Sequence, residues 1–453
     1  MPKKKTALTI EERLQQALVP AEEQPYEVPE NWVWVRFGVI AEIVTGGTPS
    51  KKHPEYYGGN FPFYKPSDLD QGRLTYDASE YLSEEGKKVS RIIPKNSTAV
   101  CCIGSIGKCG YLMCEGTTNQ QINSAIPKIN SLCLYYYLCT ENFVQNLLSM
   151  ASATTIAIVN KSKMESCAFP LPPLSEQQRI VERIEELFAK LDEAKERLQE
   201  VAESFAVRKA ALLHKAFTGE LTKQWRLENG VSDESWEEKK GEDFFEYVTS
   251  GSRGWAKYYS DKGSIFVRMG NLNHGTIELD LSDIQYVELP DQVEGQRSKL
   301  QKNDILISIT ADVGMIGLVR EDMDAYINQH VALARPKNDL YAEFLAWYFV
   351  SDVGLQQMQN KQRGATKIGL GLQDIRSIIL KIPTLPEQHE IVRLIDDLLA
   401  RERAAQQAAE QALASIDLMK KSILARAFRG ELGTNKASEA SALELLKQVL
   451  AEN

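Results

Sequence analysis

The chain lacks the features of a membrane or secreted protein. No apolar run approaches the roughly 20 residues that a helix needs to cross a bilayer. The N-terminus, Met1 to Lys5, is basic, but no apolar segment follows it, so no secretory signal is predicted. We therefore expect a cytoplasmic protein without a membrane partner.

Cysteine and histidine are few and poorly placed for metal binding. All seven cysteines fall between Cys101 and Cys167, without a C-x-x-C pair, and the second half of the chain has none. The five histidines are scattered, without ligand spacing. Cysteines with this spacing are usually small buried residues of a protein in a reducing compartment. A zinc site is the less favoured alternative. We predict no metal site.

Familiar catalytic motifs are also missing. The nearest match to the Asn/Asp-Pro-Pro-Tyr/Phe motif of an amino-methyltransferase is Leu-Pro-Pro-Leu at residues 171–174. Residues 104–108 resemble a phosphate loop, but Cys102 and Cys109 stand where a Walker loop requires glycine and serine or threonine. Glu-Ala-Lys at 193–195 has no acidic partner upstream of the kind that a nuclease needs. We predict no catalytic residues.

Positive charge is not in excess. The chain has 53 Lys and Arg against 62 Asp and Glu, a net charge of -9. Because neutralising DNA phosphates requires Lys and Arg, this balance argues weakly against a nucleic-acid partner. The sum covers the whole molecule, however, and a basic groove would not show in it. At 453 residues the chain is long enough for two or more domains.

What the chain does contain is an internal duplication. Leu-Pro-Pro-Leu-Ser-Glu-Gln-Gln at 171–178 returns as Ile-Pro-Thr-Leu-Pro-Glu-Gln-His at 382–389. Lys-Ala-Phe-Thr-Gly-Glu-Leu at 215–221 returns as Arg-Ala-Phe-Arg-Gly-Glu-Leu at 426–432. Both pairs are 211 positions apart (387 − 176 and 428 − 217). The last part of each repeat therefore keeps its length to the residue.

The preceding segments match at smaller shifts. Thr45-Gly46-Gly47 matches Thr249-Ser250-Gly251 at 204, residues 94–96 match 301–303 at 207, and Asn119-Gln120 match Asn328-Gln329 at 209. Loops accept insertions at little cost, whereas a fixed length suggests a rigid element whose dimension matters.

The fixed-length segments predict long helices with heptad spacing. The first seam comprises Ile180, Ile184, Leu187, Leu191, Ala194, Leu198, Val201 and Phe205. The second comprises Ile391, Ile395, Leu398, Glu402, Ala405, Ala409, Ala412 and Ile416, with Glu402 as an interruption. Ser175 with Gln178 suggests a capping box, and Gly219 and Gly430 mark the ends. About 40 residues give a rod of about 60 Å. Two equal rods would pack together as a spacer, although such a seam is as often ordinary core.

The variable segments, residues 22–169 and 236–380, predict two α+β domains. Runs such as 97–100 and 304–309 favour strands, and helices are expected at 134–150, 345–358, 9–19 and 441–450. The expected divisions are residues 1–21, 22–170, 171–225, 226–381, 382–432 and 433–453. These are, in turn, an N-terminal extension, the first domain, a helical spacer, the second domain, a second spacer and a tail.

This pattern resembles the specificity subunits of type I restriction-modification enzymes over nearly the whole chain. The duplicated motifs at 170–177 and 382–388 carry the resemblance, with 217–226 and 427–432. Thr-Gly-Gly-Thr-Pro-Ser at 45–50, Gly-Ser-Ile-Gly at 104–107 and Thr-Asn-Gln-Gln at 118–121 resemble motifs of the family's target recognition domains. The second domain departs more, since residues 311–314 and 328–330 are only loosely similar.

The resemblance implies two pseudo-symmetric recognition domains separated by an antiparallel coiled coil. Each domain would read one half of a split, asymmetric site in double-stranded DNA, and the helices would fix the gap. Two methyltransferase subunits with S-adenosylmethionine would methylate adenine N6, and two motor-nuclease subunits with ATP and magnesium would join for restriction. This chain itself would bind no cofactor and would be non-catalytic.

Candidate DNA contacts follow from residue type and matching loop positions. Arg, Lys, Asn and Gln read base edges, and Lys and Arg contact phosphates. In the first domain the candidates are Lys65, Ser67, Asp68, Ser105, Lys108, Asn119 and Gln120. In the second they are Arg268, Asn271, Asn273, Asn328, Gln329, Lys361, Arg363 and Lys367, with Gly364 inside the last group as a phosphate site. Polar loop residues are often simply solvated, and Asn119 and Asn328 could be turn formers.

Two other functions stay open at this point. The chain could be a self-contained enzyme, such as a methyltransferase with a divergent motif. It could also be a coiled-coil adaptor that binds no DNA.

Overall fold

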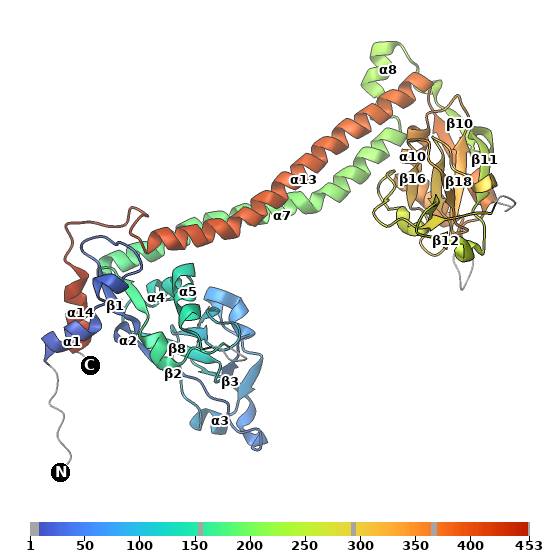
Figure 1. Cartoon of the computed structure of the whole chain (residues 1–453). Helices are drawn as coiled ribbons and strands as arrows, with labels where there is room; N and C mark the ends of the chain where they lie inside the picture. Colours follow the sequence, from blue (N-terminus) through green and yellow to red (C-terminus); the bar gives the residue numbers. More distant parts are fainter. Residues whose placement is uncertain (1–8, 153–156, 291–295, 364–368, 452–453) are drawn as a thin grey trace. The chain divides into compact units, whose positions relative to one another are not determined.

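The computed structural model describes residues 9–152, 157–290, 296–363 and 369–451. The chain forms two compact units (Figure 1). The first comprises Met1–Leu198 with Gln411–Asn453, and the second Gln199–Glu410. Each unit therefore holds one mixed domain and a part of both long helices, so the helical segments are not units of their own.

The first unit contains two sheets. The larger has the order β2 (Ala41–Thr45), β8 (Ile122–Pro127), β5 (Thr98–Cys101) and β6 (Cys109–Tyr111), all antiparallel. The smaller has the order β4 (Glu80–Leu82), β3 (Tyr57–Tyr64) and β7 (Thr117–Thr118), with β3 and β7 parallel. Every residue of β5 is buried, because this central strand has a sheet neighbour on each side and core on both faces.

The second unit repeats this topology. Its larger sheet has the order β11 (Phe245–Ser250), β18 (Val331–Pro336), β15 (Ile305–Ser308) and β16 (Ile316–Leu318). Its smaller sheet has the order β12 (Tyr259–Ser260), β14 (Tyr286–Val287), β13 (Ser264–Val267) and β17 (Ala325–Ile327), and β13 and β17 are again parallel. The duplication in sequence is thus a duplication of fold, and the predicted α+β class is confirmed.

The backbone fixes which residues of the two copies are equivalent. A Cβ at Gly46 would overlap the carbonyl oxygens of Thr118 and Asn119, and a Cβ at Gly251 those of Ile327 and Asn328. Gly46 therefore corresponds to Gly251, and the shift there is 205 (251 − 46) rather than the predicted 204. The match of Asn96 to Asn303 is confirmed, since both have positive φ (67° and 73°).

A pair of strands leads from each domain into a long helix. In the first unit β1 (Val33–Arg36) pairs with β9 (Ala168–Leu171), and in the second β10 (Glu237–Lys240) pairs with β19 (Ile379–Ile382). The helices α7 (Leu174–Phe217) and α13 (Leu385–Ala427) begin directly after β9 and β19. Both strand pairs are antiparallel, so each ties the start of a domain to its end.

The long helices lie antiparallel within each unit. In the first, Ile180 and Ile184 on α7 share a hydrophobic cluster with Leu424 on α13 and with Phe428 directly after it. Further along α7, Asp192 binds Lys420, which is further back on α13. In the second unit, Leu213 packs with Ile391 and Ile395, whereas Arg208 binds Glu402. Packing of the two rods against each other is thus confirmed.

The predicted seam fails in the alanine-rich part of the second unit. Val201 of the first predicted seam has 42% of its surface exposed, and Ala405 of the second predicted seam is exposed as well. Toward the start of α13, Leu399 is buried in place of the expected Leu398.

Two further predictions about helices are wrong. The helix expected at 134–150 is split into α4 (Ser131–Leu138) and α5 (Glu141–Met150), and that at 345–358 into α10 (Ala342–Val350) and α11 (Asp352–Asn360). At each break a buried hydroxyl, that of Thr140 or Ser351, caps the following helix. It accepts a hydrogen bond of 3.3 Å from a backbone N–H three residues later.

The predicted capping box at the start of α7 is also wrong. Ser175 lies inside the helix, and the side chain of Gln178 bonds Asn130 and Glu182 instead. The helix ends are confirmed, because Gly219 and Gly430 follow them with φ of 79° and 75°. The expected end helices are present as α1 (Ile10–Ala17) and α14 (Ala442–Ala451).

The duplicated Glu-Gln motif makes a buried junction in each unit. Glu176, near the start of α7, accepts hydrogen bonds from Trp32, Thr434 and Asn435 at 2.7–3.2 Å. Glu387, near the start of α13, accepts from Thr222 at 2.7 Å and Arg226 at 2.6 Å. Each carboxylate thus binds the segment that follows the other long helix. This role accounts for the constant distance, in both copies, from the Glu-Gln motif to the end of its own long helix.

Candidate nucleic-acid interface

One end of the first domain gathers four loops. The strands β2, β3, β5 and β7 all end there, and β6 and β8 begin there. Backbone hydrogen bonds join the loops, from Asn119 to Tyr64 at 3.1 Å and from Cys102 to Gln121 at 2.7 Å. We call residues 46–53, 65–70, 102–108 and 119–121 the first loop cluster. It contains every candidate that the sequence predicted in this domain.

The second domain has an equivalent second loop cluster, residues 251–258, 268–273, 309–315 and 328–330. Asn328 donates to Val267 at 3.1 Å and Ile309 to His330 at 2.9 Å, in the same places as in the first. Lys361 and Arg363 lie close to it, because Gly369, which pairs with Arg363, also pairs with Thr310. Lys367 and Gly364 lie outside the described residues.

Four of the candidate side chains shape the loops. Asp68 accepts the backbone N–H of Lys65 at 2.7 Å, and Asn271 accepts that of Arg268 at 2.9 Å. Asn119 and Asn328 each accept a backbone N–H two residues later at 3.0 Å. Since Asp68, Asn119 and Asn271 are also buried, these residues position the loops, as the turn-former alternative states.

Most candidate cations already have a carboxylate partner. The pairs are Lys65–Glu80 at 2.8 Å, Lys108–Asp70 at 2.6 Å, Arg268–Asp283 at 3.1 Å and Arg363–Asp374 at 3.0 Å. No ion pair joins Lys361 to the part of the chain that the structure describes. We did not predict these pairs from the sequence, because their members come together only through the fold.

Sequence reasoning missed four exposed cations on these loops. Lys51 and Lys52 follow β2, and Arg253 and Lys257 follow β11. Lys52 and Lys257 occupy equivalent places, since they are 205 positions apart (257 − 52). None of them has a carboxylate partner among the described residues. Their position just after the Thr-Gly-Gly and Ser-Gly segments was the signal that could have identified them.

The polar candidates include two glutamines with fixed partners, the exposed Gln120 and the half-buried Gln329. Gln120 accepts a hydrogen bond from the Thr48 hydroxyl at 2.5 Å. Gln329 lies 2.9 Å from His330, whose other ring nitrogen is 2.6 Å from the Thr310 hydroxyl. Ser67, Ser105 and Asn273 are exposed on the same loops. Side chains held in this way are suited to read hydrogen-bonding groups of a ligand.

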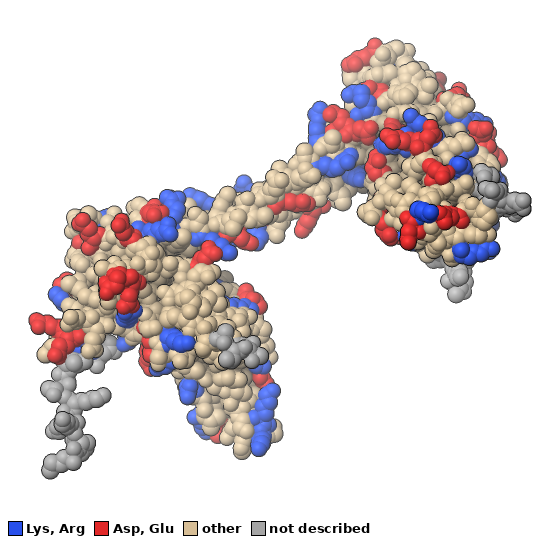
Figure 2. Space-filling view, viewed as in Figure 1, with Lys and Arg blue, Asp and Glu red and all other residues tan. Residues whose placement is uncertain are grey.

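Charge on each unit is mixed. Figure 2 shows Lys and Arg interspersed with Asp and Glu over the visible face of both units. A basic groove, which the net charge could not reveal, is not evident on this face, and the exposed cations of the loop clusters are local features. Short-range contacts, rather than a broad positive field, would have to hold an anionic ligand here.

The cysteines beside the first loop cluster are inert. Burial raises the pKa of the Cys102 thiol to about 12 and also raises the pKa of Cys101 above its usual value. Their thiols therefore stay protonated at neutral pH and are poor nucleophiles. Among the described residues no group of three His, Cys, Asp or Glu side chains is placed to hold a metal ion. Nor is any described helix long and apolar enough to span a bilayer.

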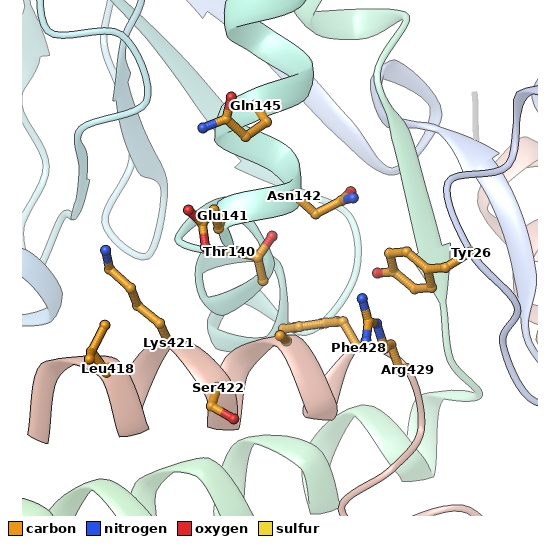
Figure 3. A pocket seen from close by; sticks show the side chains of 11 residues that line it. Tyr26, Thr140, Glu141, Asn142, Gln145, Leu418, Lys421, Ser422, Phe428 and Arg429 are labelled. Carbon is orange, nitrogen blue, oxygen red and sulfur yellow. The ribbon is translucent and has the colours of Figure 1, made fainter. Parts of the chain in front are cut away.

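A hollow of about 470 Å³ lies away from the loops, between α5 and the end of α13 in the first unit (Figure 3). Glu141 and Asn142 line it from α5, and Lys421 from α13. Arg429 stacks over the Tyr26 ring at 5.3 Å at its side. Burial raises the pKa of the Tyr26 hydroxyl, so this ring stays neutral. No loop-cluster residue contributes to this hollow, which is therefore separate from the candidate interface.

Known proteins share both the sequence and the fold. The EcoBI specificity subunit of Escherichia coli is 28% identical over 340 residues, covering 70% of this chain and 71% of the relative. The EcoKI specificity subunit of Escherichia coli K12 is 25% identical over 455 residues, covering 94% and 96%. The HsdS subunit of Thermoanaerobacter tengcongensis, 17% identical, superposes with a TM-score of 0.64 over 90% of this chain and 99% of its own. The last likeness establishes the fold.

The family described as type I restriction modification DNA specificity domain matches residues 29–203 and 233–412. The two matched regions each take in one loop cluster and the first part of one long helix. The chain therefore belongs to the family of type I restriction-modification DNA specificity subunits.

Proposed function

We propose that each loop cluster reads one half of a split, asymmetric site in double-stranded DNA. The observation that carries this proposal is the recurrence of one loop architecture on two domains whose exposed side chains differ. Gln120 and Gln329 occupy equivalent places but have different partners, Thr48 and His330. Equivalent scaffolds with different exposed groups fit two half-sites of different sequence.

The long helices would set the gap between the half-sites. α7 has 44 residues and α13 has 43. Each is about 65 Å long at roughly 1.5 Å per residue. The nearly equal lengths and the two equivalent junctions, at Glu176 and Glu387, support a spacer rather than an incidental core.

The chemistry would belong to partner subunits. Two methyltransferase subunits would dock on this chain and methylate adenine N6 with S-adenosylmethionine. Two motor-nuclease subunits would join for restriction and use ATP and magnesium. This chain would act as the non-catalytic, DNA-reading scaffold of that complex, without a cofactor of its own.

A domain exchange tests the proposal. Residues 240–380 are replaced by the equivalent domain of a relative, the chain is co-expressed with its methyltransferase subunit, and the methylated bases of the host genome are sequenced. We expect one half-site to change and the other half-site and the gap to stay the same. A change in both half-sites would contradict independent reading.

One further measurement addresses the enzyme alternative. Crosslinking of labelled S-adenosylmethionine to the isolated chain is expected to give no product. Specific labelling of this chain would instead make it a methyltransferase.

A further inference from the structure

One ion pair recurs in the two domains although its residues differ. Lys65 lies 2.8 Å from Glu80 in the first domain, and Arg268 lies 3.1 Å from Asp283 in the second. In both copies the carboxylate is 15 residues after the cation (80 − 65 and 283 − 268). The residue types have changed between the copies, whereas the pairing of opposite charges has been kept.

The backbone holds both cations in the same way. Lys65 directly follows β3 and Arg268 directly follows β13, the strands that pair in parallel with β7 and β17. The backbone N–H of each is bound by a side chain three residues later, from Asp68 or Asn271. The two cations are therefore equivalent members of the two loop clusters.

The two pairs are exposed enough to exchange partners. The side chains of Lys65 and Arg268 are 37% and 33% exposed, and those of Glu80 and Asp283 are 31% and 90% exposed. Ion pairs in such positions contribute little to folding. A phosphate oxygen accepts the same charge-assisted hydrogen bonds as a carboxylate oxygen, so it can replace the carboxylate.

We propose that Lys65 and Arg268 are equivalent DNA-phosphate contacts, and that Glu80 and Asp283 are built-in competitors which the phosphate must displace. The proposal rests on the proposed function, in which the loop clusters face DNA. The competition lowers the affinity for DNA of any sequence. At a cognate site, contacts to the bases add the binding energy that offsets this loss. At a given protein concentration the cognate site therefore stays occupied while other DNA is released, although the ratio of the two affinities does not change.

The test uses the full chain with its methyltransferase subunits and two labelled duplexes. One duplex carries the methylated sequence found by sequencing the host genome, and the other lacks it. Affinity is measured at several salt concentrations. Glu80→Gln with Asp283→Asn should tighten binding of both duplexes by about two- to five-fold, and should leave the ratio of their affinities nearly unchanged.

Removal of the cations should act differently. Lys65→Ala with Arg268→Ala should lower the affinity for both duplexes by a similar factor. It should also make the plot of log affinity against log salt shallower by about 0.9 for each lost contact. Lys65→Arg with Arg268→Lys, which keeps both charges, should retain the slope.

A matched control separates this effect from net charge. Glu23→Gln frees Arg36, whose side chain is 29% exposed, from an ion pair at 2.6 Å. Arg36 lies at the end of β1, at the opposite end of the domain from the first loop cluster. We expect no change for either duplex. Equal tightening by Glu23→Gln, no tightening by the Glu80 and Asp283 changes, or an unaltered slope without the two cations would each overturn the proposal. Wild-type protein without salt-dependent DNA binding would instead refute the proposed function.

Discussion

The side chains of the loop clusters fall into two groups. Some bind backbone amides and shape the loops, and others stay free to bind a ligand. Asp68, Asn119, Asn271 and Asn328 use their oxygens on backbone amides of their own loops. Gln120 stays exposed, with only its carbonyl oxygen engaged. Residue type alone put all of these side chains in one class, because Asn and Asp are turn formers as well as base readers.

Gln120 gives a prediction at this scale. Thr48 donates to its Oε1, so its amide N–H groups are left to donate to a base acceptor. Gln120→Ala should relax the requirement for one base in one half-site, with a loss of about 1–3 kcal/mol of discrimination. Sequencing of methylated genomic DNA would reveal this as degeneracy at that base. Strict recognition of both half-sites by the variant would contradict a base-reading role.

The two buried junction glutamates give a second prediction. Glu387 neutralises Arg226, and both side chains are buried, whereas Glu176 accepts only from uncharged groups. Arg226 also pairs with the exposed Asp233 at 2.8 Å. Glu387→Gln leaves the buried Arg226 with this exposed partner alone among the described carboxylates, and should cost about 3 kcal/mol. Glu176→Gln weakens neutral hydrogen bonds and should cost about 1–2 kcal/mol. Thermal unfolding of the full chain measures both, and equal losses would contradict the role assigned to Arg226.

At the scale of elements, hydrophobic spacing predicted which segments are helical better than where they bend. The 3-4 spacing found α7 and α13, because long amphipathic helices repeat the same signal many times. It missed the breaks at Thr140 and Ser351, where apolar residues continue on both sides but a hydroxyl bonds the backbone. In α13 it also missed the exposure of Ala405, since whether a small residue is covered depends on the facing side chain.

The lengths of the long helices carry a prediction at this scale. Four residues inserted after Leu198 in α7 and after Glu410 in α13 add about 6 Å. At about 3.4 Å per base pair the gap should grow by about two base pairs, while both half-sites stay the same. Sequencing of the methylated genome measures gap and half-sites together. Altered half-sites with an unaltered gap would count against a spacer role for these helices.

At the scale of the whole molecule, net charge and local charge say different things. The chain is acidic overall, yet exposed cations without a carboxylate partner among the described residues lie on both loop clusters, namely Lys51, Lys52, Arg253 and Lys257. A net sum reports solubility and long-range attraction and does not locate a binding surface.

DNA binding by the assembled protein should therefore depend strongly on salt. With the methyltransferase partner present, log affinity for a duplex should fall linearly as log salt rises, because each phosphate contact releases counterions. Gel shift or fluorescence anisotropy over a salt series gives the slope. No shift at any salt concentration would favour the adaptor that binds no DNA.

The sequence by itself determined the duplication, the two α+β domains and the long helices, because each follows from local spacing and from motifs that occur twice. It also identified the loops that carry the candidate residues. Only the tertiary structure decided which of those side chains already have hydrogen-bond or ion-pair partners within the protein. The pairs Lys65–Glu80 and Arg268–Asp283 join residues on different elements, and the bonds of Glu176 and Glu387 join residues more than 140 positions apart. Such contacts form only when the elements pack.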